Sequence, residues 1–430
     1  MMNDSWMSKK ESPLLGLQGM GGGVGGFNFL SAAGEGGGVW AWGLNSHRLY
    51  LNNDSVTRRS SPVQIGTNTN WTLFKLGAQI SAYAAINSDK ELYTWGNQTQ
   101  GQLGQNSGPP AGKKGLTEVS ALPGSWTDIS TAMQTMCALK DDNTLWVWGE
   151  NRNGQLGLNS SNYNGPSSPT QIPGSWATAV VGGSDSSIGG MGVKTDGTLW
   201  TWGRNRYGKL GYTSPSVAQE GATRYSSPTQ VGTDTTWGKE KGNISMGDNA
   251  SFAIKTNGTL WGWGNGWAGV LGDGVGNSNL AHTSPKQIGT NTNWASILTA
   301  DYGVDRSYAI KTNNTMWVWG QNSLGVLGLN SAENGGGTYE DGASSPTQLP
   351  GSWKIGGCNN VGVKDMAWVK EDGTLWSWGY NANGSLGLNI PMDAPGYGPS
   401  RSSPCQIGSG TDWLGGTGGS DSQLGAWGAK

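Results

Sequence analysis

The sequence is poor in charge, and its acidic and basic residues nearly cancel. Charged residues make up 13% of the 430 positions, with 27 Lys and Arg against 29 Asp and Glu. Proteins that bind nucleic acid take much of their affinity from clustered Lys and Arg that neutralise phosphates. The composition implies no basic face, so we expect no nucleic acid among the partners.

Cysteine and histidine, on which most metal sites and many catalytic sites depend, are scarce. The cysteines Cys137, Cys358 and Cys405 are far apart, and the two histidines, His47 and His282, fall in different parts of the chain. Zinc sites need closely spaced ligands, and a catalytic triad needs a His beside a nucleophile and an acid. We therefore expect no disulfide framework, no metal, no cofactor and no enzymatic activity.

The carboxylates are scattered through turns. Asp273 begins a stretch that is weakly similar to a calcium-binding loop but lacks the acidic residue at the twelfth position of such loops. Asp185, Asp248 and Asp421 each follow a glycine or a Gly-Ser pair near the end of a strand-like run. They would either line one rim of the fold or make turn hydrogen bonds, and the sequence leaves both interpretations open.

Long apolar runs are absent as well. No run approaches the roughly 18 residues that a transmembrane helix needs, and the first residues lack the apolar segment of a signal peptide. We therefore expect neither membrane insertion nor a secretory route, which points to the cytoplasm unless the chain is part of a larger particle.

Glycine and tryptophan are abundant, with 75 and 24 residues, and their distribution is periodic. A stretch of the form LWxWG recurs at intervals of about 53 to 61 residues, ending at Gly43, Gly96, Gly149, Gly203, Gly264, Gly320 and Gly379. Tandem units of that length are typical of solenoids and propellers.

Each repeat contains four short β-type runs separated by Gly, Asp and Asn. The second and third runs flank a Lys-Thr-Asp-Gly-Thr type of turn, as at 194–198, which suits a hairpin with positive φ. The third run, LWxWG, is apolar on both faces, so it must be covered on both sides. Radially stacked four-stranded blades provide that cover.

A second set of tryptophans marks the connector into each repeat. Its members are Trp71, Trp126, Trp176, Trp237, Trp294, Trp353 and Trp413. Because both sets follow the repeat, we expect these rings to form the core and not a ligand cage.

The two ends of the chain complement each other. The stretch from Trp413 supplies two strands of a unit and stops, whereas the first repeat begins at Val39 with the third strand. A blade shared between the ends would lock the ring, because opening it would expose sheet edges. We therefore predict an all-β, seven-bladed propeller of four-stranded blades over residues 39–430, preceded by a Gly-rich extended arm over residues 1–38.

The ordered pattern of a Lys-x-Asp/Asn-Gly hairpin, LWxWG, N-x-x-G-x-LG and SPxQ resembles the repeat of the regulator of chromosome condensation (RCC1-like) family. The resemblance covers about residues 39–430 and implies a seven-bladed β-propeller. The family includes a nucleotide exchange factor, ubiquitin ligase components, a plant ultraviolet receptor and a bacterial enzyme inhibitor. The resemblance therefore implies a fold without choosing a function.

The arm is too apolar for an inert linker. Its candidate anchor residues are Leu14, Leu15, Leu17, Met20, Phe27, Phe29 and Leu30. Two interpretations stay open: a loose tail or a strip that folds back over the propeller, and an anchor that orders against another protein. The arm also resembles the starts of virion structural proteins of marine tailed phages, which implies a place in a virion.

The loops between the x-LG and SPxQ motifs vary most between repeats, and equivalent loops of a propeller emerge on one face. A tyrosine falls late in four of them, at Tyr163, Tyr225, Tyr339 and Tyr397. These are candidate partner-binding residues, because loops carry recognition and Tyr is favoured in binding surfaces. The alternative is plain surface, with the rings packed on the blade below.

Together these features predict a non-enzymatic structural or recognition propeller, a tail- or capsid-associated component of a phage virion. Its partners would be other virion proteins and a host-surface receptor. The alternative is a soluble protein-binding module inside a cell, of the exchange-factor or enzyme-inhibitor type.

Overall fold

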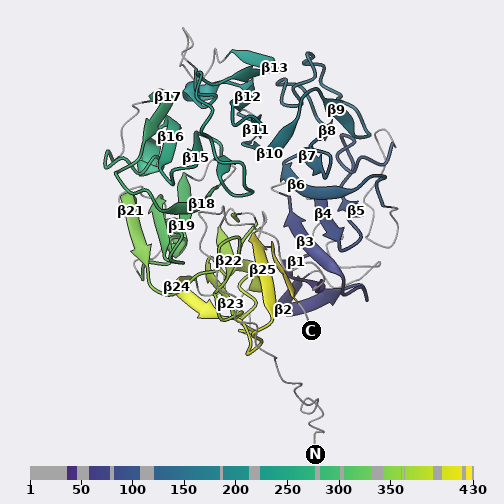
Figure 1. Ribbon diagram of the computed structural model, residues 1–430. Helices are drawn as coiled ribbons and strands as arrows, with labels where there is room; N and C mark the ends of the chain where they lie inside the picture. Colours follow the sequence, from purple (N-terminus) through teal and green to yellow (C-terminus); the bar gives the residue numbers. More distant parts are fainter. Residues whose placement is uncertain are drawn as a thin grey trace, which may run out of the picture.

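The computed structural model describes residues 36–45, 58–77, 82–106, 121–184, 187–212, 223–276, 281–300, 305–330, 342–359, 361–362, 364–390, 400–418 and 423–428. Within these residues the chain is built from antiparallel sheets, which stand like blades around a central axis (Figure 1). The predicted all-β propeller is confirmed.

The first and last strands of the chain share one sheet, at the bottom of the ring in Figure 1. Its spatial order is β2 (Arg58–Ile65), β1 (Gly38–Leu44), β26 (Gln423–Gly428) and β25 (Trp413–Gly418). Trp40 of β1 pairs with Ala426 of β26 in an antiparallel register. The prediction that the chain ends close the ring through a shared sheet is therefore confirmed.

The other sheets follow one another along the chain. Four of them have four strands each. The first two are the sheet of β6 (Trp126–Ala132), β7 (Thr135–Lys140), β8 (Leu145–Gly149) and β9 (Thr170–Ile172) and the sheet of β10 (Trp176–Gly182), β11 (Gly189–Lys194), β12 (Leu199–Arg204) and β13 (Arg224–Gln230). The next two are the sheet of β14 (Ile244–Met246), β15 (Ala250–Ile254), β16 (Leu260–Asn265) and β17 (Ala281–Gln287) and the sheet of β18 (Trp294–Thr299), β19 (Arg306–Lys311), β20 (Met316–Gly320) and β21 (Ala343–Leu349). Two have three strands: β3 (Trp71–Leu76), β4 (Ala82–Asn87), β5 (Leu92–Gly96); β22 (Asp365–Val369), β23 (Leu375–Gly379), β24 (Arg401–Gln406). One-turn 3₁₀ helices follow four of the LWxWG strands: η2 (Arg206–Gly208), η3 (Trp267–Gly269), η4 (Ser323–Gly325) and η6 (Ala382–Gly384).

The two three-stranded sheets depart from the predicted four strands per blade. Before β22, the first strand is reduced to a bridge between Trp353 and Lys370. A turn replaces the rest of it, because Gly356 adopts a φ of 71° and the next residue donates its N–H to Lys354 O at 2.8 Å. Beside β5, a bridge between Leu92 and Leu122 remains among the described residues.

The LWxWG strands are covered on both faces, as predicted. In β12, Trp202 is fully buried while Trp200 is half-buried, and the strand pairs with β11 on one side and β13 on the other. The same burial pattern recurs in β8, β16, β20 and β23. All seven connector tryptophans are buried as well, so both sets of rings form the core.

In most LWxWG strands, the second tryptophan also joins its blade to the preceding one. Trp202 Nε1 donates to Gln155 O at 2.8 Å. Gly157, with a φ of 65°, lies against the same ring, where a Cβ would come within 3.1 Å of Trp202 Cδ1. Equivalent inter-blade hydrogen bonds run from Trp148 to Gln102 O (2.9 Å), Trp263 to Lys209 O (2.8 Å), Trp319 to Val270 O (2.6 Å) and Trp378 to Val326 O (2.7 Å). The N-x-x-G-x-LG motif is therefore the acceptor side of a blade contact.

In the LWxWG strands that follow a Lys-Thr-Asp-Gly-Thr type of turn, the first tryptophan is held by that turn. Asp196 Oδ1 accepts hydrogen bonds from Thr198 N (2.9 Å) and Oγ1 (2.6 Å), and Thr198 Oγ1 accepts one from Trp200 Nε1 (2.7 Å). The turn glycine has the predicted positive φ, at 86°. Lys194 Nζ lies 3.7 Å from the Trp200 ring centroid and 5.3 Å from that of Trp176, a cation–π contact that stabilises the turn.

Candidate functional site

The variable loops and the hairpin turns between the first two strands of a blade emerge at the same end of the sheets. Gly189, the first residue of β11, pairs with Gly203 near the end of β12. The β10–β11 turn therefore lies beside the start of the β12–β13 connection. We call this end of the sheets the loop face.

Tyr163 is the exposed tyrosine of the loop face. Its side chain is 50% exposed. Among the described residues, the other exposed large hydrophobic side chain is Val275, at 39%. Its backbone is fixed, because Tyr163 O accepts a hydrogen bond from Asn151 N at 3.2 Å. The Arg152 guanidinium lies 5.7 Å from the ring centroid.

Tyr225 lies close to that loop but is packed differently. It is a half-buried residue of β13, and its ring meets Tyr212 edge-on at 4.6 Å. The Tyr163 loop reaches the same strand, since Asn159 N donates to Ser226 O at 2.7 Å. The structure thus brings the Tyr163 and Tyr225 regions together across two neighbouring blades and tucks the Tyr225 ring against its own blade.

The remaining candidate residues lie outside the described part of the chain. These are the loop tyrosines Tyr339 and Tyr397 and the arm residues Leu14, Leu15, Leu17, Met20, Phe27, Phe29 and Leu30. Their roles in partner binding and anchoring, and the division into an arm over 1–38 and a propeller over 39–430, stay predictions.

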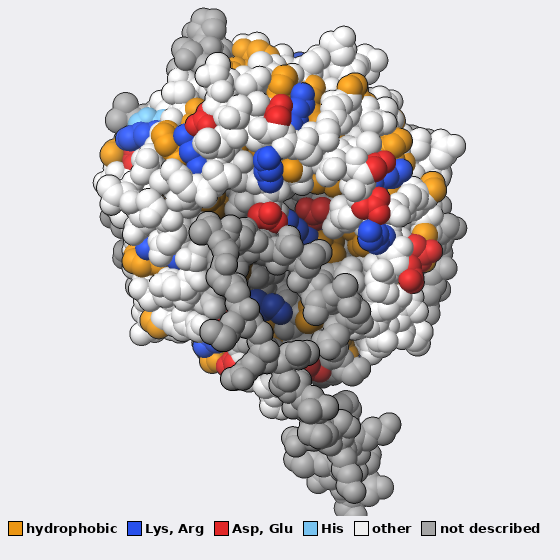
Figure 2. Space-filling view, in the orientation of Figure 1, with side chains coloured by type: hydrophobic (Ala, Val, Ile, Leu, Met, Phe, Trp, Pro, Cys, Tyr) orange, Lys and Arg blue, Asp and Glu red, His pale blue; other side chains and the backbone are white. Residues whose placement is uncertain are grey.

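Sequence reasoning missed a group of arginines around Tyr163 and Tyr225. It consists of Arg152, Arg204, Arg206 and Arg224, and we call it the arginine cluster. The sequence contained a partial signal, because Arg204 and Arg206 flank Asn205, which is the first residue of an N-x-x-G motif. The other two arginines join them only through the fold, which overall composition cannot reveal. On the face of the molecule that Figure 2 shows, acidic and basic side chains are mixed among mostly uncharged ones.

Asp248 makes turn hydrogen bonds and does not line an open rim. It is buried, and its Oδ1 accepts hydrogen bonds from Ser184 N (2.7 Å), Ser184 Oγ (2.6 Å) and Ser187 Oγ of the neighbouring blade. Burial alone would raise the pKa of Asp248, but Lys209 and these hydrogen bonds outweigh it and lower the pKa. Asp185 and Asp421 lie outside the described residues.

Some side chains contact residues of a non-adjacent blade. Lys241 Nζ forms an ion pair with Asp128 Oδ1 at 2.8 Å, although the two residues belong to blades separated by β10–β13. On the other side, Lys75 Nζ donates to Asn359 O at 2.6 Å, past β25 of the shared sheet. The pKa of Lys75 is lowered to about 8, mainly by burial and in addition by the charge of Lys241. These polar contacts connect blades that are not neighbours in the ring.

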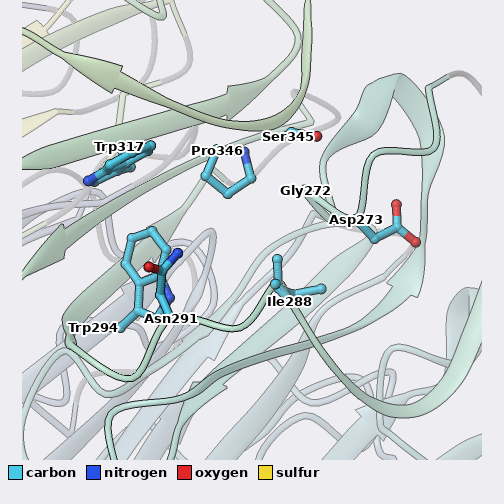
Figure 3. A pocket seen from close by; sticks show the side chains of 9 residues that line it. Gly272, Asp273, Ile288, Asn291, Trp294, Trp317, Ser345 and Pro346 are labelled. Carbon is cyan, nitrogen blue, oxygen red and sulfur yellow. The ribbon is translucent and has the colours of Figure 1, made fainter.

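A small cavity lies between the outer parts of two neighbouring blades (Figure 3). Its volume is about 250 Å³, and its walls include Trp294, Trp317, Ile288 and Pro346. Asp273 reaches its edge with the carboxylate turned away from the tryptophans. That carboxylate is engaged by His282 Nε2 at 2.9 Å and Lys286 Nζ at 3.3 Å.

That cavity is smaller than most pockets for small molecules, which span roughly 300–1,000 Å³. Within the described ranges, no group of three or more His, Cys, Asp or Glu is placed to hold a metal ion. The part of the chain that the structure describes also contains no helix long and apolar enough to cross a membrane. The loop face around Tyr163 is the surface on which the predicted partner-binding residues Tyr163 and Tyr225 lie.

These features define a class of protein: a ring-closed β-propeller of tryptophan repeats, with inter-blade hydrogen bonds at most of the LWxWG strands. Residues 142–189 and 196–254 match the Regulator of chromosome condensation (RCC1) repeat, and residues 243–266 match a second form of it. The chain therefore contains RCC1 repeats within residues 142–266, and the family resemblance read from the sequence is confirmed.

Two curated proteins illustrate the range of relatives. The E3 ubiquitin-protein ligase HERC2 of Homo sapiens is 30% identical over 254 residues, which cover 58% of this chain and 5% of the ligase. The Ultraviolet-B receptor UVR8 of Arabidopsis thaliana is 23% identical over 360 residues, which cover 83% of this chain and 76% of the receptor. This chain thus spans a small fraction of the ligase and about three quarters of the receptor.

Among solved structures, Prp20p of Saccharomyces cerevisiae has the same fold. Its TM-score is 0.73 at 17% sequence identity, with 92% of each chain covered. At that identity the likeness shows the architecture alone.

Proposed function

We propose that this chain is a non-enzymatic, seven-bladed propeller that binds a protein partner through the loop face around Tyr163. The observation that carries the proposal is the half-exposed ring of Tyr163 beside the arginine cluster. The backbone of Tyr163 is held in place by a hydrogen bond from Asn151 N. Tyr and Arg are the residues that most often dominate the binding energy of protein interfaces. A rigid ring also presents its loops with little conformational entropy left to lose on binding.

The relatives support a protein-binding role. Prp20p is described by its binding to Gsp1p and histones, and yeast RCC1 (Prp20) by its complex with Kap60. Those partners belong to that protein, and what we carry over is the use of an RCC1 propeller as a protein-binding surface. Ubiquitin transfer is not carried over, because the match covers 5% of HERC2.

This proposal replaces the virion role that the N-terminal arm suggested. The curated relatives are cellular proteins such as a ubiquitin ligase and a light receptor. The arm residues on which the virion interpretation depended lie outside the described part of the chain. Detection of the intact chain in purified phage particles would reinstate the virion role and overturn the cellular one.

A capture experiment with matched variants tests the proposal. The full-length chain is immobilised, exposed to extract from its own source, and compared with Tyr163→Ser and Val275→Ser. Val275 is the matched control, because it is another exposed apolar side chain, at 39%. We expect one stoichiometric partner with the parent and the Val275 variant, weakened about tenfold or more with Tyr163→Ser. Equal capture by all three proteins, or no specific partner with any, would overturn the proposal.

A further inference from the structure

In five blades a lysine at or directly after the end of the second strand lies over the two tryptophans of its repeat. These lysines are Lys140, Lys194, Lys255, Lys311 and Lys370. Each Nζ lies 3.5–4.2 Å from the centroid of the first LWxWG ring and 4.7–5.3 Å from that of the connector ring. The face of an aromatic ring attracts a cation electrostatically. The repeat therefore builds a cation site in these five blades and fills it with its own lysine.

The blade of β3, β4 and β5 has the two rings but a different residue at the lysine position. Trp71 and Tyr93 meet edge-on at 5.3 Å, as the two rings of other blades do. Asn87 is paired with Trp71 in the sheet, just as Lys194 is paired with Trp176. The asparagine side chain is shorter than lysine and carries no charge. This blade therefore keeps the aromatic part of the site without a lysine at that position.

A carboxylate lies beside these rings. Glu91 takes the turn position that a threonine holds in the five lysine-containing blades, and its backbone O accepts the corresponding hydrogen bond from Asn87 N at 3.2 Å. Its Oε2 accepts hydrogen bonds from Asn87 Nδ2 at 2.8 Å and Tyr93 Oη at 3.0 Å, and neither donor is charged. The adjacent Lys90 pairs instead with Asp141 at 2.9 Å. Burial raises the pKa of Tyr93, and the hydrogen bond and charge of Glu91 raise it further, so the carboxylate acts directly on this ring.

Tyr93 and Glu91 lie at the end of the sheet opposite the loop face. They belong to the turn between β4 and β5, whereas the loop face carries the turns between the first two strands of each blade. Both side chains are half-buried, and Ser88 and Asp89 of the same turn are exposed, so solvent reaches this turn. The charge of Asp89 also raises the pKa of Tyr93, which adds a second negative group near the ring.

We infer that Tyr93 and Glu91, backed by Trp71, form a receptor for a lysine side chain of a partner protein, which we call the lysine slot. The incoming ammonium lies over the Tyr93 ring, where five other blades hold their own lysine, and forms an ion pair with Glu91. Those five blades show which cation fits this pair of rings. The negative charges of Glu91 and Asp89 disfavour a nucleic acid, because they repel its phosphates. This surface is separate from the Tyr163 region, so the inference goes beyond the proposed function.

A peptide-binding measurement with the full chain tests the inference. The probe is a fluorescent peptide of alternating Lys and Ser, and its control is the same peptide with every lysine acetylated. In the Asn87→Lys variant, the chain's own lysine fills the slot as in the other blades. Ser88→Lys is the charge-matched control, because it adds the same charge at an exposed position of the same turn. We expect the parent to bind the lysine peptide, with affinity that falls as salt rises, and to ignore the acetylated one.

Asn87→Lys should bind the lysine peptide about tenfold or more weakly, while Ser88→Lys changes by less than about threefold. Its urea midpoint should equal or exceed that of the parent, because the new lysine gains the rings and Glu91, and this verifies an intact propeller.

A second pair of variants separates the slot from general charge. Glu91→Gln should also weaken binding about tenfold, whereas Glu371→Gln, at an exposed turn position beside Lys370, should not. No binding by the parent, equal loss in Asn87→Lys and Ser88→Lys, or equal binding of the acetylated peptide would overturn the inference. Self-association of the parent that Asn87→Lys abolishes would make the occupant a second copy of this chain and overturn the assignment to a partner protein. Tyr163→Ser should leave peptide binding unchanged, so this inference and the proposed function can fail separately.

Discussion

Trp42 Nε1 donates a hydrogen bond to Ser385 O at 2.7 Å, although the two residues are 343 positions apart. It is the same inter-blade bond that Trp202 makes to Gln155 within the middle of the chain. The closing contact of the ring is therefore a copy of an ordinary blade contact, made between the two ends of the chain. Gly387 lies against the Trp42 ring as Gly157 lies against Trp202, which completes the likeness.

Replacing Trp42 by Phe removes this closing hydrogen bond and keeps an aromatic ring in the core. We expect a loss of about 1–3 kcal/mol in the free energy of unfolding, because a buried carbonyl loses its donor and a small cavity forms. Urea denaturation followed by tryptophan fluorescence would measure it. Hydrogen exchange should also rise in β1 and β26, because Trp42 helps to hold this sheet against the neighbouring blade.

Trp202→Phe is the matched control for that prediction, because it breaks the same bond inside the chain. It should cost a similar free energy but leave the exchange rates of β1 and β26 nearly unchanged. Faster exchange in the shared sheet with both variants, or with neither, would contradict a specific closing role for Trp42.

Much of the fold could be predicted from the sequence, because the sequence of each repeat determines its strands and turns locally. LWxWG strands apolar on both faces require cover, the Lys-Thr-Asp-Gly-Thr turn requires a positive φ, and the complementary chain ends require a shared sheet. The structure agrees on all three. What could not be predicted depends on partners about fifty residues away, such as the carbonyl of Gln155 that accepts from Trp202.

The candidate site was predicted less completely, for a physical reason. Tyr163 could be selected because its loop varies and Tyr favours interfaces, but exposure depends on packing, and Tyr225 is instead packed against Tyr212. The arginine cluster forms because β13 returns Arg224 to Arg204 and the next loop over supplies Arg152. Composition averages such a cluster away over the whole chain.

Leu324 occupies a left-handed backbone conformation, with a φ of 61°, in the N-x-x-G turn of its repeat. The corresponding residue of a later repeat is Asn383, with a φ of 55°. Asn tolerates this conformation better than Leu, because its short polar side chain bonds locally. Leu324→Asn should therefore raise the free energy of unfolding by about 0.5–1 kcal/mol, measured by urea denaturation.

The reciprocal change, Asn383→Leu, should lower the free energy of unfolding by a similar amount. If Leu324→Asn destabilises the protein instead, packing of the leucine side chain outweighs the backbone strain at this turn.

Asp365 at the start of β22 makes the stability depend on pH. It is fully buried, and burial raises its pKa to about 8, above the ordinary Asp value of 3.8. The folded chain therefore keeps a proton on Asp365 that the unfolded chain releases. Linkage then makes the contribution of Asp365 to stability fall as the pH rises from about 4 to about 8.

Asp365→Asn should abolish that fall, because the amide stays neutral at every pH. At pH 9 the variant should be more stable than the parent by about 1–3 kcal/mol, and at pH 4 the two should be similar. Urea midpoints at both pH values measure the difference. Asp412→Asn, at an exposed position, controls for the loss of one negative charge. A fall in stability with pH that persists in Asp365→Asn would show that another group causes it.

The two members of the Lys241–Asp128 ion pair should shift the pKa of Lys75 in opposite directions. Lys241 lowers that pKa and Asp128 raises it, with burial as the larger cause of its value of about 8. Lys241→Met should therefore move the Lys75 pKa upward, toward the ordinary value of 10.5, and Asp128→Asn should move it further down. A ¹³C NMR titration of the lysine Cε signals, assigned with Lys75→Arg, measures both shifts.

The same shift has a consequence for stability. Between pH 8 and 10.5 the unfolded chain holds a proton on Lys75 that the folded chain has released, so the contribution of Lys75 to stability rises with pH. That rise should be smaller in Lys241→Met, because the window between the two pKa values narrows, and larger in Asp128→Asn. Shifts of the same sign in both variants would mean that the ion pair acts by changing the packing around Lys75 and not through its charges.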